Sequence, residues 1–195
     1  MDFLGRIRWH VKGAAWLIVN LWRSRHLQSF PERSVGSDGA EGVLEGLSAA
    51  LVPHVRALHR GLRGYDLSWN RRILLRLEGR KFCLLWRPSD PINSTSIGGF
   101  EFFYFEPEGA LERVIHEAYI GVAVEFRGKG VSRTLRTAAS QHFVQCGLSG
   151  ITTDIEGGNV ASMRSALSVG YTHMVERGSA SGSSGPSRLL LKLTQ

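Results

Sequence analysis

A glycine-rich basic turn between a strand and a helix is the feature that most constrains this chain. The apolar stretch VAVEF at 122–126 has the pattern of a strand end, RGKG follows at 127–130, and a helical pattern runs from Ser132 to Cys146. Glycines allow the main chain to approach a ligand closely, and the N–H groups at a helix start attract anions. The stretch matches neither a Walker loop nor a complete dinucleotide-binding fingerprint. It therefore predicts a phosphate-binding turn of another kind.

A second block of small and polar residues stands in register with the first. The sequence NVAS at 159–162 opens a helical stretch, and a Gly-Tyr pair follows at 170–171. The interval between the blocks holds one helix, one strand over 151–155 and a glycine turn. Both blocks resemble the motifs of the GNAT superfamily of acyl-CoA-dependent N-acetyltransferases, in which Arg/Gln-x-x-Gly-x-Gly/Ala holds the CoA pyrophosphate. The resemblance extends from Arg72 to the C-terminus and is clearest over 116–171.

The resemblance implies both a fold and a reaction. The fold would be α/β with a mixed, α+β-like central sheet flanked by helices, a splayed strand pair, and an added N-terminal helical segment. The order of strands before mixed βα units along the chain agrees with such a sheet. The reaction would transfer acetyl from acetyl-CoA, or another acyl group from its CoA thioester, to a primary amine by direct attack in a ternary complex. The amine would belong to a small molecule, an amino sugar or a protein, and no metal would take part.

Ten residues at the family's motif positions are the candidates for binding the cofactor. By resemblance, the N–H groups of Val122 and Val124 would hold the pantetheine and the thioester carbonyl, the turn would hold the pyrophosphate, and Asn159 would contact the pantetheine. Asn159 is equally suited to capping the helix that follows it. Ser132 stands where the family has a second small Gly or Ala, which is a mild departure because serine is small. The full set is Val122, Val124, Arg127, Gly128, Lys129, Gly130, Val131, Ser132, Asn159 and Ser162.

Two neighbouring residues on the strand before the turn are the candidate general bases. His116 and Glu117 are neighbours in the sequence, and successive strand residues face opposite sides. Only one of the two side chains would therefore point into the cleft between the splayed strands. The unperturbed pKa of histidine, about 6.5, suits deprotonating an amine, and the resemblance implies a glutamate base near this position in several family members. Alternation predicts that His116 shares a face with Ala118, and that Glu117 shares a face with Tyr119. Glu101 is a third candidate.

One position departs from the family. Many members place a tyrosine seven residues after the helix-opening asparagine, where it protonates the departing thiolate, and Ala166 stands there in this chain. Tyr171 occupies an aromatic position that normally serves packing. Either solvent or another group protonates the thiolate, or the domain binds acyl-CoA without turning it over. A catalytically degenerate CoA-binding regulatory module is therefore the alternative function.

The composition fits a globular protein with an anionic ligand. Apolar residues make up 43% of the 195 residues and the formal net charge is +7, which suits CoA phosphates, nucleic acid or an anionic membrane surface. Nucleic acid is the less favoured partner, because no known binding motif is present and aromatics do not interleave with the arginine-rich stretch 56–76. Cys83 and Cys146 are interpreted as buried thiols rather than a disulfide, which predicts a reducing, cytoplasmic location.

The first 36 residues are interpreted as a separate segment. Three tryptophans and several aliphatic residues within residues 1–30 lie between basic residues at both ends, and the uninterrupted apolar run is too short to span a membrane. Three interpretations stay open: a helix packed on the domain or on a second subunit, a helix in peripheral contact with a membrane, and a poorly formed secretory signal. Residues 1–36 are thus predicted to form a helical segment and linker, and residues 37–195 a GNAT-like domain.

Periodicity and turn residues predict the remaining elements. We expect a linker over 30–42, one helix over 41–62 that is broken or kinked near Pro53, and a hairpin of strands 73–77 and 81–86. The other expected elements are strands over 100–105, 114–122, 151–155, 171–176 and 188–192, helices over 132–146 and 160–169, and polar loops over 88–96 and 178–186.

Overall fold

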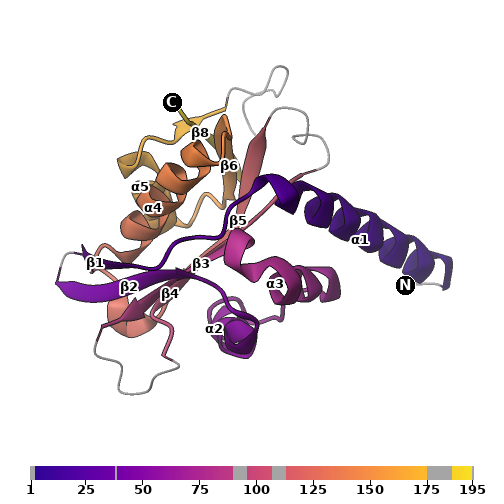
Figure 1. The fold of residues 1–195 in the computed structure, drawn as a ribbon, viewed down its shortest axis with the longest axis horizontal. Coiled ribbons are helices and arrows are strands. Elements are labelled where there is room, and N and C mark those ends of the chain that lie inside the picture. Colours follow the sequence, from indigo (N-terminus) through magenta and orange to yellow (C-terminus); the bar gives the residue numbers. More distant parts are fainter. Residues whose placement is uncertain (1–2, 38, 90–95, 107–112, 175–185, 195) are drawn as a thin grey trace.

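An eight-stranded mixed sheet organises the chain (Figure 1). The computed structural model describes residues 3–37, 39–89, 96–106, 113–174 and 186–194, so the expected loops at 88–96 and 178–186 lie mostly outside it. The strand order is β1-β2-β3-β4-β5-β6-β8-β7. Among the described strands β5 and β6 are parallel, and the other neighbours are antiparallel. The sheet is therefore antiparallel in its first half and mixed in its second, as expected.

Five α-helices and three short 3₁₀ turns connect the strands in the described residues. The strands are β1 (Arg33–Ser37), β2 (Ala40–Gly46), β3 (Cys83–Pro88), β4 (Gly99–Tyr104), β5 (Val114–Val122), β6 (Gly150–Ile155), β7 (Thr172–His173) and β8 (Ser187–Lys192). The helices are α1 (Phe3–Arg23), α2 (Val52–Arg63), α3 (Trp69–Phe82), α4 (Val131–Gln145) and α5 (Val160–Ser168), with turns η1 (Ser24–His26), η2 (Ala49–Leu51) and η4 (Val124–Phe126). From β3 onward, the expected elements that lie within the described residues are confirmed with small shifts at their ends.

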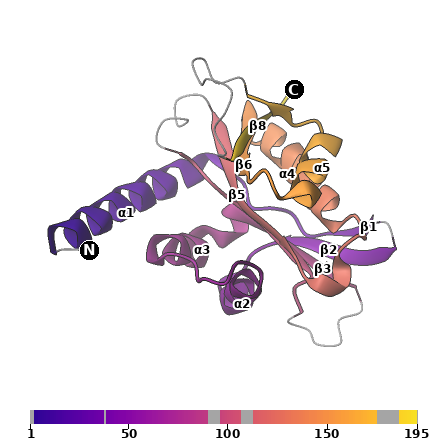
Figure 2. The ribbon, with the colours of Figure 1, turned by 180° about the vertical axis from the view of Figure 1, so that it is seen from behind.

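Helices cover both faces of the sheet, which makes the core two-sided (Figure 2). On one face, Phe143 of α4 packs edge-on against Phe103 of β4, with ring centroids 4.8 Å apart. On the other face, His59 of α2 packs against Tyr119 of β5 at 4.7 Å. Most of the side chains between these layers are buried, and partly buried ones such as Tyr119 pack against them. This rigid sheet is the frame on which the candidate site is built.

The expected linker over 30–42 is wrong from residue 33 onward, and the expected helix over 41–62 is wrong in its N-terminal part. The chain instead forms the antiparallel pair β1–β2, then η2, and only then α2. Pro53 lies in the first turn of α2, where its missing N–H costs no helical hydrogen bond, so it starts the helix rather than kinking it. The boundary expected between residues 36 and 37 falls inside β1, which is part of the sheet.

Two inward-facing glycines explain why the sequence of β2 lacks the apolar alternation of a strand. A Cβ on Gly42 would lie 2.4 Å from the ring of Trp86, and a Cβ on Gly46 would lie 2.5 Å from the carbonyl oxygen of Arg80. Both glycines therefore occupy positions on the packed side of the strand, where no side chain fits. Because glycine carries no hydropathy signal, the strand alternation of β2 is invisible to a search for apolar residues.

The expected strand over 73–77 is wrong as well, because these residues belong to α3. Leu74 and Leu75 are fully buried, whereas Leu77 is 62% exposed. A short apolar run is ambiguous between a strand and a helix, and the helical assignment wins here because the buried pair packs against the sheet. The expected hairpin is thereby reduced to its second strand, β3.

A β-bulge at Ala118 changes which side chains of β5 share a face. Adjacent residues of β4 pair with Glu117 and with Tyr119, so Ala118 is the extra residue. Glu117 consequently points toward α4, and Tyr119 points toward α2 on the opposite face. The expectation that Glu117 and Tyr119 share a face is therefore wrong. Period-two alternation holds only where a strand has no bulge.

The N-terminal segment is helical, as expected, and packs against α3. None of the helices in the described chain is both long and apolar enough to cross a membrane. Cys83 is fully buried and Cys146 is half-buried, and both are unpaired thiols, in agreement with the sequence interpretation.

Candidate functional site

Strands β5 and β6 are paired over their first residues and then diverge. Their parallel register joins Val114–Glu117 to Gly150–Thr153. Beyond Glu117, within the described residues, the β6 side of β5 carries no paired strand. A cavity of about 550 Å³ opens there, bounded by the second half of β5 and by the starts of α4 and α5. Its volume suits a small-molecule ligand. The expected splayed strand pair is confirmed.

The RGKG turn lies at one side of this cavity, with both of its glycines in the left-handed conformation. Gly128 has φ 75° and Gly130 has φ 74°, values that favour glycine. The first backbone hydrogen bond of α4 runs from the N–H of Thr134 to the carbonyl of Gly130, at 3.0 Å. The N–H groups of Val131 and Ser132 precede it and have no acceptor within the helix. This end of α4 therefore offers backbone donors and a positive dipole end to an anion.

Two cations flank the turn. Arg127 is exposed, and its Nε donates to the carbonyl oxygen of Val122 at 3.4 Å. Lys129 places its Nζ 5.4 Å from the ring centroid of Phe126. Neither cation is ion-paired with a carboxylate in the part of the chain that the structure describes. Both charges are thus left to act on an anion at the turn.

The start of α5 forms the opposite wall. Asn159 caps this helix, because its Oδ1 accepts a hydrogen bond from the N–H of Ser162 at 3.2 Å. The hydroxyl and carbonyl oxygens of Ser162 accept from Arg136 of α4, at 3.2 and 3.0 Å. The capping role considered for Asn159 is confirmed. Arg136 ties the two helix starts together across the cavity.

Glu117 is held in a buried network on the α4 side of the sheet. Arg136 donates to its two carboxylate oxygens at 3.0 and 2.7 Å, and the hydroxyl of Tyr171 donates to it at 3.1 Å. Thr153 donates to its backbone carbonyl at 3.2 Å. Burial alone raises the pKa of Glu117, but the charge and hydrogen bonds of Arg136 outweigh burial and lower that pKa below its ordinary value. Glu117 is therefore an ion-paired carboxylate.

Glu101, the third candidate base, is fully buried beside this network. Its carboxyl group interacts with that of Glu117 in the neighbouring network. Burial raises its pKa well above the ordinary value, and the negative charge of Glu117 raises it further. The raised pKa favours the protonated form of this carboxyl group, which has no free carboxylate to accept a proton.

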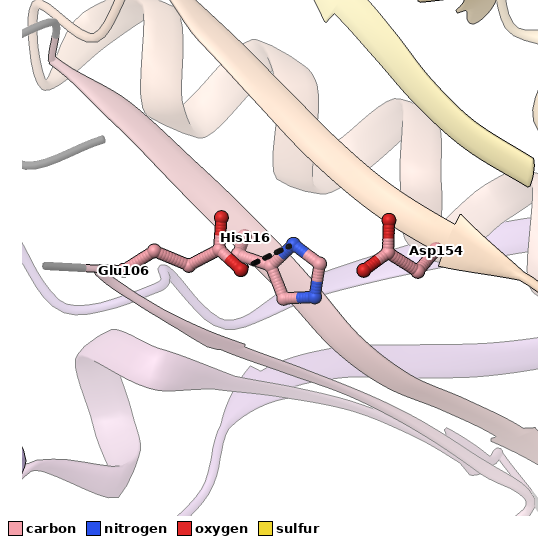
Figure 3. A group of neighbouring side chains, drawn as sticks. All are labelled: Glu106, His116 and Asp154. Carbon is pink, nitrogen blue, oxygen red and sulfur yellow. Dashed lines mark ion pairs between the residues drawn. The ribbon is translucent and has the colours of Figure 1, made fainter. Parts of the chain in front are cut away.

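His116 lies on the other side of β5 from Glu117, in a polar cluster where β5 is paired with both β4 and β6. Its Nδ1 lies 3.1 Å from the hydroxyl of Thr152 and 3.8 Å from a carboxylate oxygen of Glu106. Figure 3 shows the imidazole between Glu106 and Asp154. Burial lowers the pKa of His116 below its ordinary value, partly opposed by the charges of Glu106 and Asp154. The imidazole is therefore neutral at physiological pH.

The cluster of His116, Glu106 and Asp154 has ligand types that can hold a metal ion. Arg188 interacts with both carboxylates, since it is ion-paired with Glu106 and lies 3.9 Å from a carboxylate oxygen of Asp154. A guanidinium charge at this position compensates the carboxylates and opposes a second cation. The cluster is better suited to moving a proton than to holding a metal.

Sequence reasoning missed Arg136 and the role of Tyr171. An arginine inside a helical pattern is easily taken for a surface residue, yet Arg136 precedes the buried Ala139 and Phe143 by three and seven residues, which places it on the inward side of α4. That spacing is the signal that could have found it. Ala166, where the family has a tyrosine, is fully buried. Tyr171 is buried too, and its hydroxyl is engaged by Glu117.

No family model and no curated protein matches the sequence. Solved structures do match. An acetyltransferase of the GNAT family from Listeria monocytogenes has a TM-score of 0.62 at 13% identity, covering 83% of this chain and 100% of its own. The GNAT domain of S. lividans PAT has a TM-score of 0.65 at 14% identity, covering 83% and 97%. Diaminobutyrate acetyltransferase EctA from Paenibacillus lautus, solved with L-2,4-diaminobutyric acid and coenzyme A, has a TM-score of 0.61 at 20% identity, covering 80% and 96%.

The chain has the GNAT fold. The resemblance drawn from two short motifs is thereby confirmed at the level of the fold. Within this GNAT fold, most of the sequence-predicted cofactor residues line the same cavity, while Val124 and Lys129 lie beside it. Those lining the cavity are Val122, Arg127, Gly128, Gly130, Val131, Ser132, Asn159 and Ser162. Their contacts with a cofactor remain predictions.

Proposed function

We propose that this chain is an acyl-CoA-dependent N-acetyltransferase, which transfers acetyl from acetyl-CoA to a primary amine. The observation that carries the proposal is the meeting of two features at one cavity: a helix start behind two left-handed glycines, and a strand whose partner diverges beside it. The first suits a pyrophosphate and the second suits an extended, hydrogen-bonding chain such as pantetheine. EctA, which shares the fold, is described with coenzyme A.

In this proposal the turn residues bind the pyrophosphate. The N–H groups of Gly130, Val131 and Ser132 donate to phosphate oxygens, and Arg127 and Lys129 supply positive charge. Acetyl-CoA supplies the acyl group as a thioester. The residues fit this group because the space around Gly128 is open: a Cβ placed there would have no neighbour within 4 Å.

The free edge of β5 is proposed to orient the thioester. The N–H of Ala123 donates to Gly98 of the loop before β4, at 2.9 Å. Because alternate N–H groups of a strand point to opposite sides, the N–H of Val122 faces the side from which β6 has diverged. A backbone donor aimed at the carbonyl oxygen stabilises the charge that develops there during attack by the amine. Val124 belongs to η4, so its N–H lies in the turn beyond the end of β5.

His116 is proposed as the proton acceptor in preference to Glu117. The carboxylate of Glu117 is already bound by Arg136, and its lowered pKa makes it a weak base. His116 does not line the cavity itself, so in this proposal its neutral imidazole accepts, through an intervening water, the proton that the amine loses as the C–N bond forms and the C–S bond breaks. Glu106 then stabilises the imidazolium. Glu117 instead positions Arg136 and, through it, the start of α5.

An acyl-CoA-binding module without turnover is the second candidate function. It is favoured by one observation: the buried Ala166 offers no hydroxyl for protonating the thiolate, and the nearby Tyr171 donates its own hydrogen bond to Glu117. In the transferase, solvent protonates the thiolate. Both functions need the same cofactor site, so binding alone does not separate them.

The test is thiol release from acetyl-CoA in the presence of a panel of primary amines. The transferase predicts release that depends on an amine and is lost in His116→Ala, while CoA affinity is unchanged. His54→Ala, which replaces an exposed histidine of α2, is the matched control and should retain activity. If thiol release is no faster with any amine than without one, and CoA nevertheless binds tightly, the binding module is favoured.

A further inference from the structure

Helix α1 carries an apolar face that no other described residue covers. Val11, Ala15, Ile18 and Trp22 follow one another at spacings of four, three and four residues, which places them on one side of the helix. Val11 is 62% exposed, Ile18 67% and Trp22 55%. Scattered apolar residues on a surface need no explanation, but a continuous row along one helix marks a contact surface. We call these four residues the α1 stripe.

The opposite side of α1 is anchored, and this anchoring fixes the stripe outward. Asn20 is fully buried. Its Nδ2 donates to the carbonyl of Phe105 at 3.2 Å, and its Oδ1 accepts from the N–H of Phe105 at 2.7 Å. A Cβ on Gly13 would lie 2.9 Å from the ring of Trp69, so α1 lies directly on α3 at this point. Turning the stripe inward would break the pairing of Asn20 and leave buried backbone groups unsatisfied.

The charge of α1 discriminates between classes of partner. Its 21 residues include no acidic side chain. The basic ones are Arg6, Arg8, Lys12 and Arg23, and Arg25 follows in η1. With a net charge of +7 on the chain, pairing two copies through this helix would bring like charges together. The guanidinium of Arg23 lies 5.6 Å from the ring of Trp22, so apolar and cationic groups meet at the end of the stripe. These charges favour an anionic partner.

We propose that the α1 stripe docks on an anionic lipid surface, with α1 lying in the plane of the membrane interface. An amphipathic helix with tryptophan on its apolar side and lysine or arginine around it has the composition of interfacial helices. The basic residues add attraction to anionic headgroups. Figures 1 and 2 show α1 reaching away from the sheet. The helix then binds the bilayer without crossing it.

The experiment is co-sedimentation of the full chain with vesicles. One set contains phosphatidylcholine with phosphatidylglycerol, and the other contains phosphatidylcholine alone. The proposal predicts binding to the first set that weakens as salt is added, and little binding to the second. The double variant Ile18→Asp, Trp22→Asp should bind the anionic vesicles about tenfold more weakly or worse. Leu167→Asp, at an exposed position of α5, is the matched control and should bind like the wild type.

Several results would overturn the proposal. These are no sedimentation with anionic vesicles, equal binding by the stripe variant and the Leu167→Asp control, or a dimer without lipid that is lost in the stripe variant. Thermal unfolding checks that the stripe variant is folded. If it is not, Lys12→Glu with Arg25→Glu provides a second route, since both side chains are exposed and their reversal should abolish the preference for anionic vesicles. None of these readouts depends on CoA binding.

Discussion

Arg136 and Glu117 form a buried two-point ion pair, in which Nε and Nη2 of the guanidinium donate to different oxygens of the carboxylate at 3.0 and 2.7 Å. The pair joins α4 to β5, and Arg136 extends the connection to Ser162 at the start of α5. Three walls of the candidate cleft thus meet at one buried arginine. Its charge is compensated, which is the condition under which a buried ion is tolerated.

Removing one partner of this pair should destabilise the protein strongly. Arg136→Met leaves the carboxylate of Glu117 buried without its counter-ion, and we expect a loss of about 3–5 kcal/mol of unfolding free energy. Urea unfolding followed by circular dichroism measures it. The double variant Arg136→Met, Glu117→Leu should lose less than the single variant. Arg60→Met, at a largely exposed ion pair with Asp66, should lose about 1 kcal/mol or less. Equal losses in Arg136→Met and Arg60→Met would contradict the buried pair.

Glu101 should make stability fall as pH rises. Burial raises its pKa, so the folded protein keeps the proton at pH values where the unfolded chain, with a pKa of about 4.3, has lost it. This contribution is complete below about pH 4 and decreases above it by about 1.4 kcal/mol per pH unit until the folded pKa is reached. Glu101→Gln removes the titration. Its stability relative to the wild type should therefore improve in urea unfolding as the pH rises from about 4 toward the folded-state pKa of Glu101. If the unfolding free energies of the wild type and Glu101→Gln change with pH in parallel, Glu101 does not have a raised pKa in the folded protein.

The left-handed glycines should be required for their backbone conformation and not for space. Gly128→Ala must hold φ near 75°, which costs a residue with a Cβ about 1–2 kcal/mol, although that Cβ would meet no neighbour. We expect weaker CoA binding, with partial recovery in Gly128→Asn because asparagine tolerates positive φ better. Gly157→Ala, in an open turn without positive φ, is the control. Calorimetric affinities that are the same for both alanine variants would contradict this account.

The pH dependence of turnover should reflect the protonation of His116. Its pKa lies below the ordinary value of about 6.5, so activity should fall as pH decreases through this lowered pKa, where the imidazole becomes charged and can no longer accept a proton. The fall should be present in the rate profile of Glu117→Gln and absent from the residual activity of His116→Gln. A profile that keeps its acid limb in the histidine variant would assign the base elsewhere.

The sequence predicted those parts of the molecule in which local chemistry determines the backbone. The turn at 127–130 requires glycine for positive φ, and Asn159 caps the helix that follows it, so both could be placed by residue type. The strand 114–122 was located correctly, because its β-branched residues are typical of a strand.

Other features depend on tertiary neighbours, and the sequence does not show them. Gly42 and Gly46 hide the alternation of β2, since what occupies their missing side-chain space comes from Trp86 and Arg80. The bulge at Ala118 cannot be seen in a single strand, because it is a mismatch between two strands. It separated Glu117 from Tyr119 and so changed the interpretation of both candidate bases.

The most direct test of the central claim is a calorimetric titration of CoA and acetyl-CoA into the wild-type chain and into the double variant Arg127→Ala, Lys129→Ala. The account predicts saturable binding at one site. In the double variant, binding should be weaker by about 1–3 kcal/mol for each lost charged contact, while Arg76→Ala, at an exposed arginine of α3, should bind like the wild type. No detectable association of either ligand with the folded wild-type protein would contradict the account.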